Sequence, residues 1–241
     1  MQNRRWLKIV IGIVVLAALA VTAGPYVYIH FIKSNAPKAL SLDGVSSSTP
    51  STTAKTATSG TTATAAATAG APVTYALTAD SQVGYRVVEV LFGQHTEGVG
   101  RTNAVTGTIT VDGSAVTAAT FTVDMSTLKS DEDTRDRKFN NEIMNTARFP
   151  TATFTLTQPI SLGALPADGV EISANATGDL TLHGVTKSVA LKVTAKKTGN
   201  SVAIAGNSDV VFADYGIANP SNGAVTTQDH GVIEFLLAAT A

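Results

Sequence analysis

Apolar and polar residues alternate with a period of two in one short run after another from Gln82 to the end of the chain. Successive side chains of a β-strand point to opposite faces of the sheet, so this pattern is typical of strands with one buried and one solvated face. The pattern predicts about eight strands, near residues 82–91, 105–111, 121–125, 153–157, 175–182, 189–194, 204–212 and 233–237.

Turn-forming dipeptides separate these runs and favour antiparallel neighbours. They are Asp112-Gly113, Asp168-Gly169, His183-Gly184, Gly199-Asn200 and Asn222-Gly223. Strands and helices do not alternate along the sequence, which excludes a parallel, doubly wound sheet. The sequence therefore predicts an all-β, antiparallel domain.

The segment from Ser130 to Thr146 breaks the strand pattern. Acidic residues gather at its start, where they favour a helix N-terminus, and Phe139 and Ile143 lie four positions apart on one helical face. We expect one short helix inserted between antiparallel strands, which is consistent with a barrel that carries a lid or plug.

The N-terminus carries a run from Ile9 to Ile32 without a charged side chain, preceded by Arg4, Arg5 and Lys8. As a helix the run would span roughly 36 Å, enough for a bilayer core of about 30 Å. Basic residues before the run favour a cytoplasmic N-terminus. We therefore expect a single transmembrane helix over residues 1–32 in the cytoplasmic membrane, with the rest of the chain on the extracytoplasmic side.

Two alternatives remain open for the N-terminal region. Small residues at Ala18-Leu19-Ala20 and Val21-Thr22-Ala23 also fit cleavage of a secretory signal peptide, although hydrophobicity continues beyond both sites. Residues 33–72 are predicted to be a disordered linker, because 46–70 are almost entirely Thr, Ala and Ser. The linker is either an unmodified tether or an O-glycosylated stalk. The foldable domain spans residues 73–241.

Charge and residue types argue against several functions. From Tyr75 onward 11 Lys and Arg face 17 Asp and Glu, so we expect no nucleic-acid partner. The absence of cysteine excludes thiolate-ligated metals, and His95, His183 and His230 lack ligand spacing, so no metal site is expected. No nucleophile–base motif is found, and we expect neither catalytic residues nor a cofactor.

Several motifs occur together in one order along the domain. They are Val83-Gly84-Tyr85-Arg86-Val87, Gly100-Arg101, Gly107-Thr108-Ile109, Thr134-Arg135-Asp136, Phe149-Pro150-Thr151-Ala152-Thr153-Phe154, the stretch from Gly178 to Lys187, and Asp214-Tyr215-Gly216-Ile217. In this order the chain resembles the YceI-like family, lipocalin-like polyisoprenoid-binding proteins of bacterial envelopes. It departs from that family in lacking a His near Ala79-Asp80-Ser81 and in the segment from Glu89 to His95.

The resemblance implies an eight-stranded antiparallel lipocalin-like barrel whose interior holds an isoprenoid lipid, either a polyprenyl quinone or a prenyl phosphate. It also implies homodimers, which are common in the family. Eight strands can enclose one small ligand, although side chains can fill the same interior. The leading hypothesis is therefore a membrane-tethered lipid-binding protein, and the alternative is a filled β-domain with a structural or adhesion role at the cell surface.

Apolar strand residues are the candidate site under the lipid-binding hypothesis, and each is either pocket wall or solid core. The candidates for lining the pocket are Tyr85, Val87, Phe121, Val123, Phe154, Leu156, Leu180, Leu182, Phe212 and Phe235. Arg101 and Arg135 are candidate contacts for a lipid head group, with a structural ion pair as the competing interpretation of each.

Overall fold

Thirteen β-strands and a short helical segment make up most of the described residues in a computed structural model that covers residues 36–44, 71–91, 93–223 and 225–241. The strands are β1 (Val73–Leu77), β2 (Gln82–Leu91), β3 (Gln94–Thr102), β4 (Val105–Asp112), β5 (Ala115–Asp124), β6 (Lys129–Ser130), β7 (Thr151–Leu156), β8 (Ile160–Ser161), β9 (Glu171–Leu182), β10 (Val185–Thr198), β11 (Ser201–Val211), β12 (Val225–Thr227) and β13 (His230–Thr240). The helical elements are η2 (Leu42–Gly44), η3 (Met125–Thr127), α2 (Asp133–Lys138), η4 (Phe139–Ile143) and η5 (Phe212–Tyr215).

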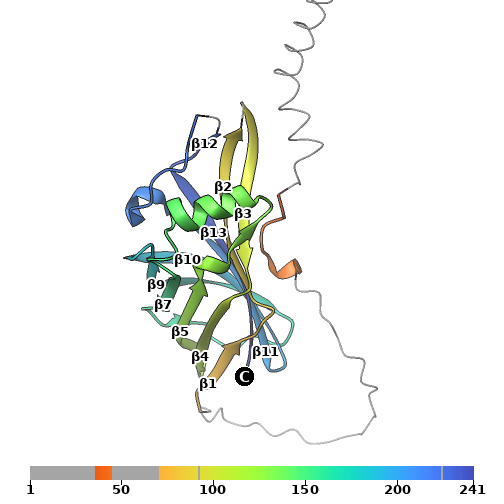
Figure 1. Cartoon of the computed structure of the whole chain (residues 1–241). Helices are drawn as coiled ribbons and strands as arrows, with labels where there is room; N and C mark the ends of the chain where they lie inside the picture. Colours follow the sequence, from red (N-terminus) through yellow and green to blue (C-terminus); the bar gives the residue numbers. More distant parts are fainter. Residues whose placement is uncertain (1–35, 45–70, 92, 224) are drawn as a thin grey trace, which may run out of the picture.

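Eight strands close into an antiparallel barrel. Their order is β1-β4-β5-β7-β9-β10-β11-β13, and the ring closes where Ala76 and Leu77 of β1 pair with Thr240 and Ala239 of β13. The predicted eight-stranded antiparallel barrel is therefore confirmed. Figure 1 shows the ring from its side, with β1 and β4 at one end.

The barrel opens out at its other end, where β2 pairs with the first half of β13. β3 pairs along the whole of β2, and the short strands β6 and β12 add to this edge. Figure 1 shows β2 and β3 rising past the helical segment as a long hairpin. β3 was not predicted, because its sequence carries polar residues and two glycines, Gly98 and Gly100, in place of alternating apolar residues.

The predicted inserted helix is present, although it is shorter than the segment 130–146. α2 covers Asp133–Lys138 and continues as one π-helical turn, η4, over Phe139–Ile143. Phe139 is buried and stacks on the Tyr85 ring with 5.0 Å between the ring centres. The helical segment lies across one end of the barrel (Figure 1), so its apolar face covers the interior.

The predicted turn at His183-Gly184 joins β9 to β10 through two residues with positive φ, 51° and 76°. This conformation belongs to the two-residue hairpin turns that match the twist of the strands. The His183 ring nitrogen Nδ1 lies 3.1 Å from the Tyr215 carbonyl, so this histidine has a structural position in a turn.

Residues 36–44 lie against the outside of the barrel, although the sequence places them in the linker. The Arg86 side chain donates to the Pro37 carbonyl over 2.7 Å, and Arg101 donates to the Lys38 carbonyl. The predicted anchor over residues 1–32 and the Thr/Ala/Ser tract over 46–70 lie outside the described residues. Within 36–44 and 71–241, apart from 92 and 224, no helix is long and apolar enough to cross a membrane.

Candidate ligand cavity

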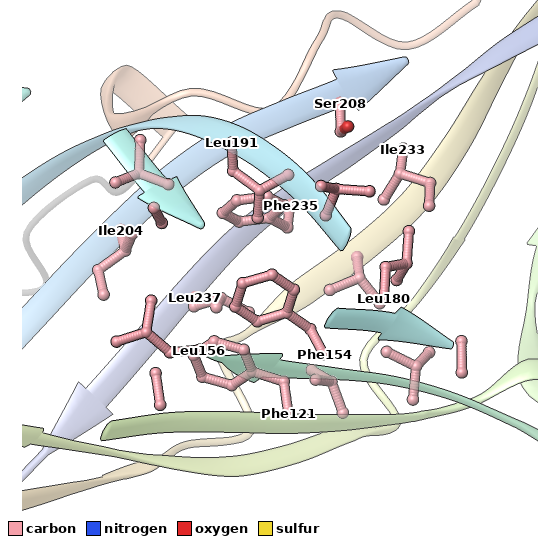
Figure 2. A pocket seen from close by; sticks show the side chains of 18 of the residues that line it. Phe121, Phe154, Leu156, Leu180, Leu191, Ile204, Ser208, Ile233, Phe235 and Leu237 are labelled. Atoms are coloured by element: carbon pink, nitrogen blue, oxygen red, sulfur yellow. The ribbon is translucent and has the colours of Figure 1, made fainter. Parts of the chain in front are cut away.

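The interior of the barrel contains a cavity of about 500 Å³ that is lined almost entirely by apolar side chains. Small-molecule sites in proteins commonly have volumes of about 300–1,000 Å³. The cavity follows from the strand pattern, because the alternate apolar residues of the eight strands all face inward. Figure 2 shows the labelled side chains converging on this space from strands on opposite sides of the barrel.

All ten residues predicted to line a pocket lie around this single cavity. Strands β2, β5, β7, β9 and β13 and the turn η5 supply them, so residues that are far apart in the sequence share one wall. Leu191, Ile204, Ile233 and Leu237 also line the cavity, although they are not among the ten predicted residues (Figure 2). Only Leu191 and Ile233 have a polar neighbour, Lys192 and Glu234, whereas Ile204 and Leu237 lie between apolar residues, so alternation with polar residues marks these four less clearly than the ten.

Four aromatic rings of the wall lie over glycines of neighbouring strands. Tyr85 lies over Gly100, Phe121 over Gly107, Phe154 over Gly178 and Phe235 over Gly206. A Cβ on Gly206 would come within 2.6 Å of the Phe235 ring, and one on Gly107 within 2.7 Å of the Phe121 ring. The missing side chains therefore leave room for the rings beside the sheet, as in the pairing of glycine with a cross-strand aromatic residue.

This arrangement of rings and glycines explains why the barrel is not filled. Phe121 and Phe154 are stacked with 6.2 Å between their ring centres and 16° between their planes. A ring that lies along the wall leaves the centre of the barrel open, whereas an ordinary side chain in place of each glycine would displace the ring inward.

Arg135 lies at the end of the cavity that the helical segment covers. Its guanidinium bonds Asp131 on the preceding turn and lies 3.4 Å from the Glu89 carboxylate of β2. Burial alone would lower the pKa of Arg135, but the two carboxylates outweigh it and raise the pKa. The structure thus places Arg135 at the cavity and also gives it the ion pairs of the competing interpretation.

Tyr85 lines the same end of the cavity, and its hydroxyl lies over Gly100 of β3. Burial raises the pKa of Tyr85, Arg135 opposes that effect, and the nearby carboxylates of Asp136, Glu89 and Asp131 add to it. The hydroxyl therefore keeps its proton over the whole physiological range, and within the described part of the chain no hydrogen-bond partner is found for it.

Lys196 and Lys197 line the opposite end of the cavity. These residues of β10 pair with the start of β11, which in turn pairs with the end of β13. Tyr85 of β2, by contrast, pairs with Ile233 near the start of β13, so the two lysines and Tyr85 lie at opposite ends. Lys197 forms an ion pair of 2.6 Å with Asp168, and Lys196 one of 3.6 Å with Glu171. The exposed Leu165 also lines this end.

Arg101 does not line the cavity, so the structure does not support the predicted head-group contact from this residue. It lies on the outer face of the sheet, where its Nη2 donates to the Glu234 carboxylate over 2.7 Å. Arg86 lies 3.4 Å from the same carboxylate, and Glu234 is only 2% exposed. The physical reason is alternation: Gly100, the residue before Arg101, faces inward beneath Tyr85, and Arg101 therefore faces outward.

Within residues 36–44, 71–91, 93–223 and 225–241, no three His, Asp or Glu side chains are grouped so as to hold a metal ion. The polar groups of the cavity are few and lie mainly near its ends, while its middle offers apolar surface. Ser208 (Figure 2) lies opposite Ile233 of β13, which in turn pairs with Tyr85, so it belongs to the end that carries Tyr85.

The sequence profile of the YceI-like domain matches residues 75–239, which span the barrel. A UPF0312 protein of Pseudomonas savastanoi pv. phaseolicola is 31% identical over 123 residues, which are 47% of this chain and 60% of that protein. Protein YceI of Escherichia coli O6:H1 is 36% identical over 89 residues, 36% of this chain and 42% of that protein. The chain thus aligns with less than two thirds of the length of these relatives.

Two solved structures share the fold. A polyisoprenoid-binding domain from Saccharophagus degradans, implicated in plant cell wall breakdown, superposes with a TM-score of 0.56 at 17% identity, covering 70% of this chain and 98% of that one. BcnA of Burkholderia cenocepacia superposes with a TM-score of 0.53 at 21% identity, covering 68% of this chain and 99% of that one.

Proposed function

This chain belongs to the YceI-like domain family, and we propose that its barrel binds the hydrocarbon tail of an isoprenoid lipid. The observation that carries the proposal is the apolar cavity of about 500 Å³ whose rings lie over glycines and leave its centre open. The name of the Saccharophagus degradans domain, which shares this fold, points to the same ligand class.

Binding would follow from burial of the tail. Each CH₂ group removed from water contributes about 0.8 kcal/mol, so a long prenyl chain needs few polar contacts. The wall suits such a chain, because Leu, Val, Ile and Phe side chains from all eight strands surround it. No residue of the cavity needs to react with the ligand, and we propose a binding role without catalysis.

We further propose that the barrel is tethered to the cytoplasmic membrane on its extracytoplasmic side. The uncharged run from Ile9 to Ile32 and the basic residues before it support this proposal. A tether would raise the effective concentration of the barrel near its lipid source. The alternative, a structural or adhesion role, would require no open interior, and the cavity therefore favours binding.

The test compares two tryptophan substitutions on neighbouring residues of β7. Leu156→Trp adds volume to the cavity wall, whereas Thr155→Trp places the same ring on the exposed outer face. The purified full-length proteins are freed of lipid and titrated with a fluorescently labelled farnesol.

We expect the parent and Thr155→Trp to bind the probe with the same affinity and Leu156→Trp to bind it at least about tenfold more weakly, because the ring occupies ligand space. Overpacking of a filled interior typically costs about 1–3 kcal/mol. No binding by the parent, together with a loss of stability of that size in Leu156→Trp, would support the filled β-domain.

A further inference from the structure

Among the residues that the structure describes, four charged side chains line the cavity, and each of them already has a partner of opposite charge. Glu89 and Arg135 pair with each other over 3.4 Å, and Arg135 also bonds Asp131. At the other end, Lys197 pairs with Asp168 and Lys196 with Glu171. Within the described part of the chain, the cavity therefore offers an incoming anion no cation that lacks a counter-charge.

We infer that the ligand of this cavity is uncharged, an isoprenoid alcohol, phenol or quinone, and that prenyl phosphates are excluded. The inference rests on the proposed lipid-binding function, because it concerns the polar end of the same ligand. It separates two ligand classes that the sequence leaves open.

The end beneath the helical segment repels anions. Glu89 and Asp131 contribute two negative charges and Arg135 one positive charge, so this group has a net charge of −1. A phosphate monoester adds roughly 1.5–2 further negative charges at neutral pH. To bind it, Arg135 would have to leave carboxylates that already hold it, or the phosphate would be buried without a counter-charge, which is costly.

The opposite end is neutral. The Asp168 carboxylate accepts hydrogen bonds from Lys197 over 2.6 Å and from the Gly199 backbone N–H over 2.8 Å. These two bonds lower the pKa of Asp168, which keeps it ionised and able to compensate the lysine. Lys196 faces Glu171, so neither lysine brings a net positive charge to this mouth.

An uncharged polar group would find a suitable partner in the Tyr85 hydroxyl. Tyr85 lines the cavity, and within the described residues no hydrogen bond to its hydroxyl is found. As a protonated phenol it can donate a hydrogen bond to a quinone carbonyl or accept one from an alcohol. Such an exchange adds no charge beside Glu89.

The experiment measures the affinity of the full-length protein for farnesol and for farnesyl phosphate, each by displacement of the same labelled probe. Both ligands carry the same tail, so the ratio of their affinities isolates the head group. We expect farnesol to bind at least about tenfold more tightly than farnesyl phosphate.

Glu89→Gln should shift this ratio toward farnesyl phosphate by about tenfold, because it removes one negative charge beside Arg135. Glu97→Gln is the matched control. Glu97 is also a β2–β3 carboxylate, but it pairs with Arg86 on the outer face, and its substitution should leave the ratio unchanged.

The possible outcomes separate the two proposals. Equal or tighter binding of farnesyl phosphate by the parent would overturn the inference and leave the lipid-binding function standing. An unchanged ratio in Glu89→Gln would show that the charge of this site does not select the ligand, which also overturns it. Failure of both ligands to bind would overturn the proposed function itself, and the inference with it.

Discussion

Glycines opposite aromatic rings set the free volume of the barrel at the residue scale. Gly206 is the clearest case, because the atom nearest to an added Cβ would be the end of the Phe235 ring, at 2.6 Å. Its backbone does not have the positive φ that would disfavour alanine. A methyl group at this position would therefore act on the ring more than on the backbone.

Gly206→Ala is expected to push Phe235 into the cavity and weaken binding of labelled farnesol several-fold. The stability of the protein should change little, because alanine in a strand interior is favoured over glycine by roughly 0.5–1 kcal/mol, which offsets the displaced ring. The double variant Gly206→Ala/Phe235→Leu should regain affinity. If the double variant binds no better than Gly206→Ala, the ring is not what closes the cavity.

Tyr85 makes stability depend on pH in a defined direction. Burial raises the pKa of Tyr85 above its ordinary value near 10. The contribution of Tyr85 to the unfolding free energy is therefore fully present below pH 10. It is lost as the pH rises from 10 toward the raised pKa, because in that range the unfolded chain has released the proton and the folded chain has not.

The loss should reach at most about 1.4 kcal/mol of unfolding free energy per pH unit above pH 10. Tyr85→Phe should lack this part of the decline, since it has no phenolic proton. Urea unfolding followed by circular dichroism between pH 9 and 11 measures both proteins. Parallel curves would show that the Tyr85 hydroxyl is not buried in the folded protein.

The element that organises the outer face is strand β13. Its Glu234 lies beneath Arg86 and Arg101, whose guanidinium groups also bond the carbonyls of Pro37 and Lys38. One buried carboxylate thus orients two side chains that hold the segment 36–44 on the barrel.

Glu234→Gln should lower the unfolding free energy by about 3 kcal/mol, because removing one partner of a buried ion pair leaves the other charges uncompensated. For a chain of this size that corresponds to a fall in Tm of roughly 6–12 °C. Thermal unfolding measures the effect. Glu171→Gln, which breaks an exposed pair, should change the free energy by less than about 1 kcal/mol, and equal losses in both variants would contradict this account.

Much of the barrel is predictable from single strands, because period-2 alternation and turn dipeptides are local signals. β3 is not, since its glycines carry no alternation and make sense only beneath Tyr85 and beside Arg135. The outward direction of the Arg101 side chain could not be predicted either, because β3 carries no alternation that would show which of its residues face inward. The open interior depends on which glycine lies opposite which ring, and that register joins residues far apart in the sequence.

At the scale of the whole molecule, closure of the ring by β1 and β13 converts alternating strands into one continuous apolar wall. The helical segment covers one end, and ion pairs occupy both ends. A molecule built in this way presents polar strand faces to water and apolar faces to the interior cavity. The predicted membrane anchor would place that wall close to a lipid source.

The most direct measurement is the lipid content of the full-length protein after expression in a host that makes isoprenoids. Organic extraction of the purified protein, followed by mass spectrometry, identifies and quantifies what the barrel holds. We predict close to one isoprenoid without a phosphate group per barrel in the parent and in Thr155→Trp, and much less in Leu156→Trp. A parent that carries no isoprenoid, or the same content in Leu156→Trp as in the parent, would contradict the claim that the cavity is an isoprenoid site.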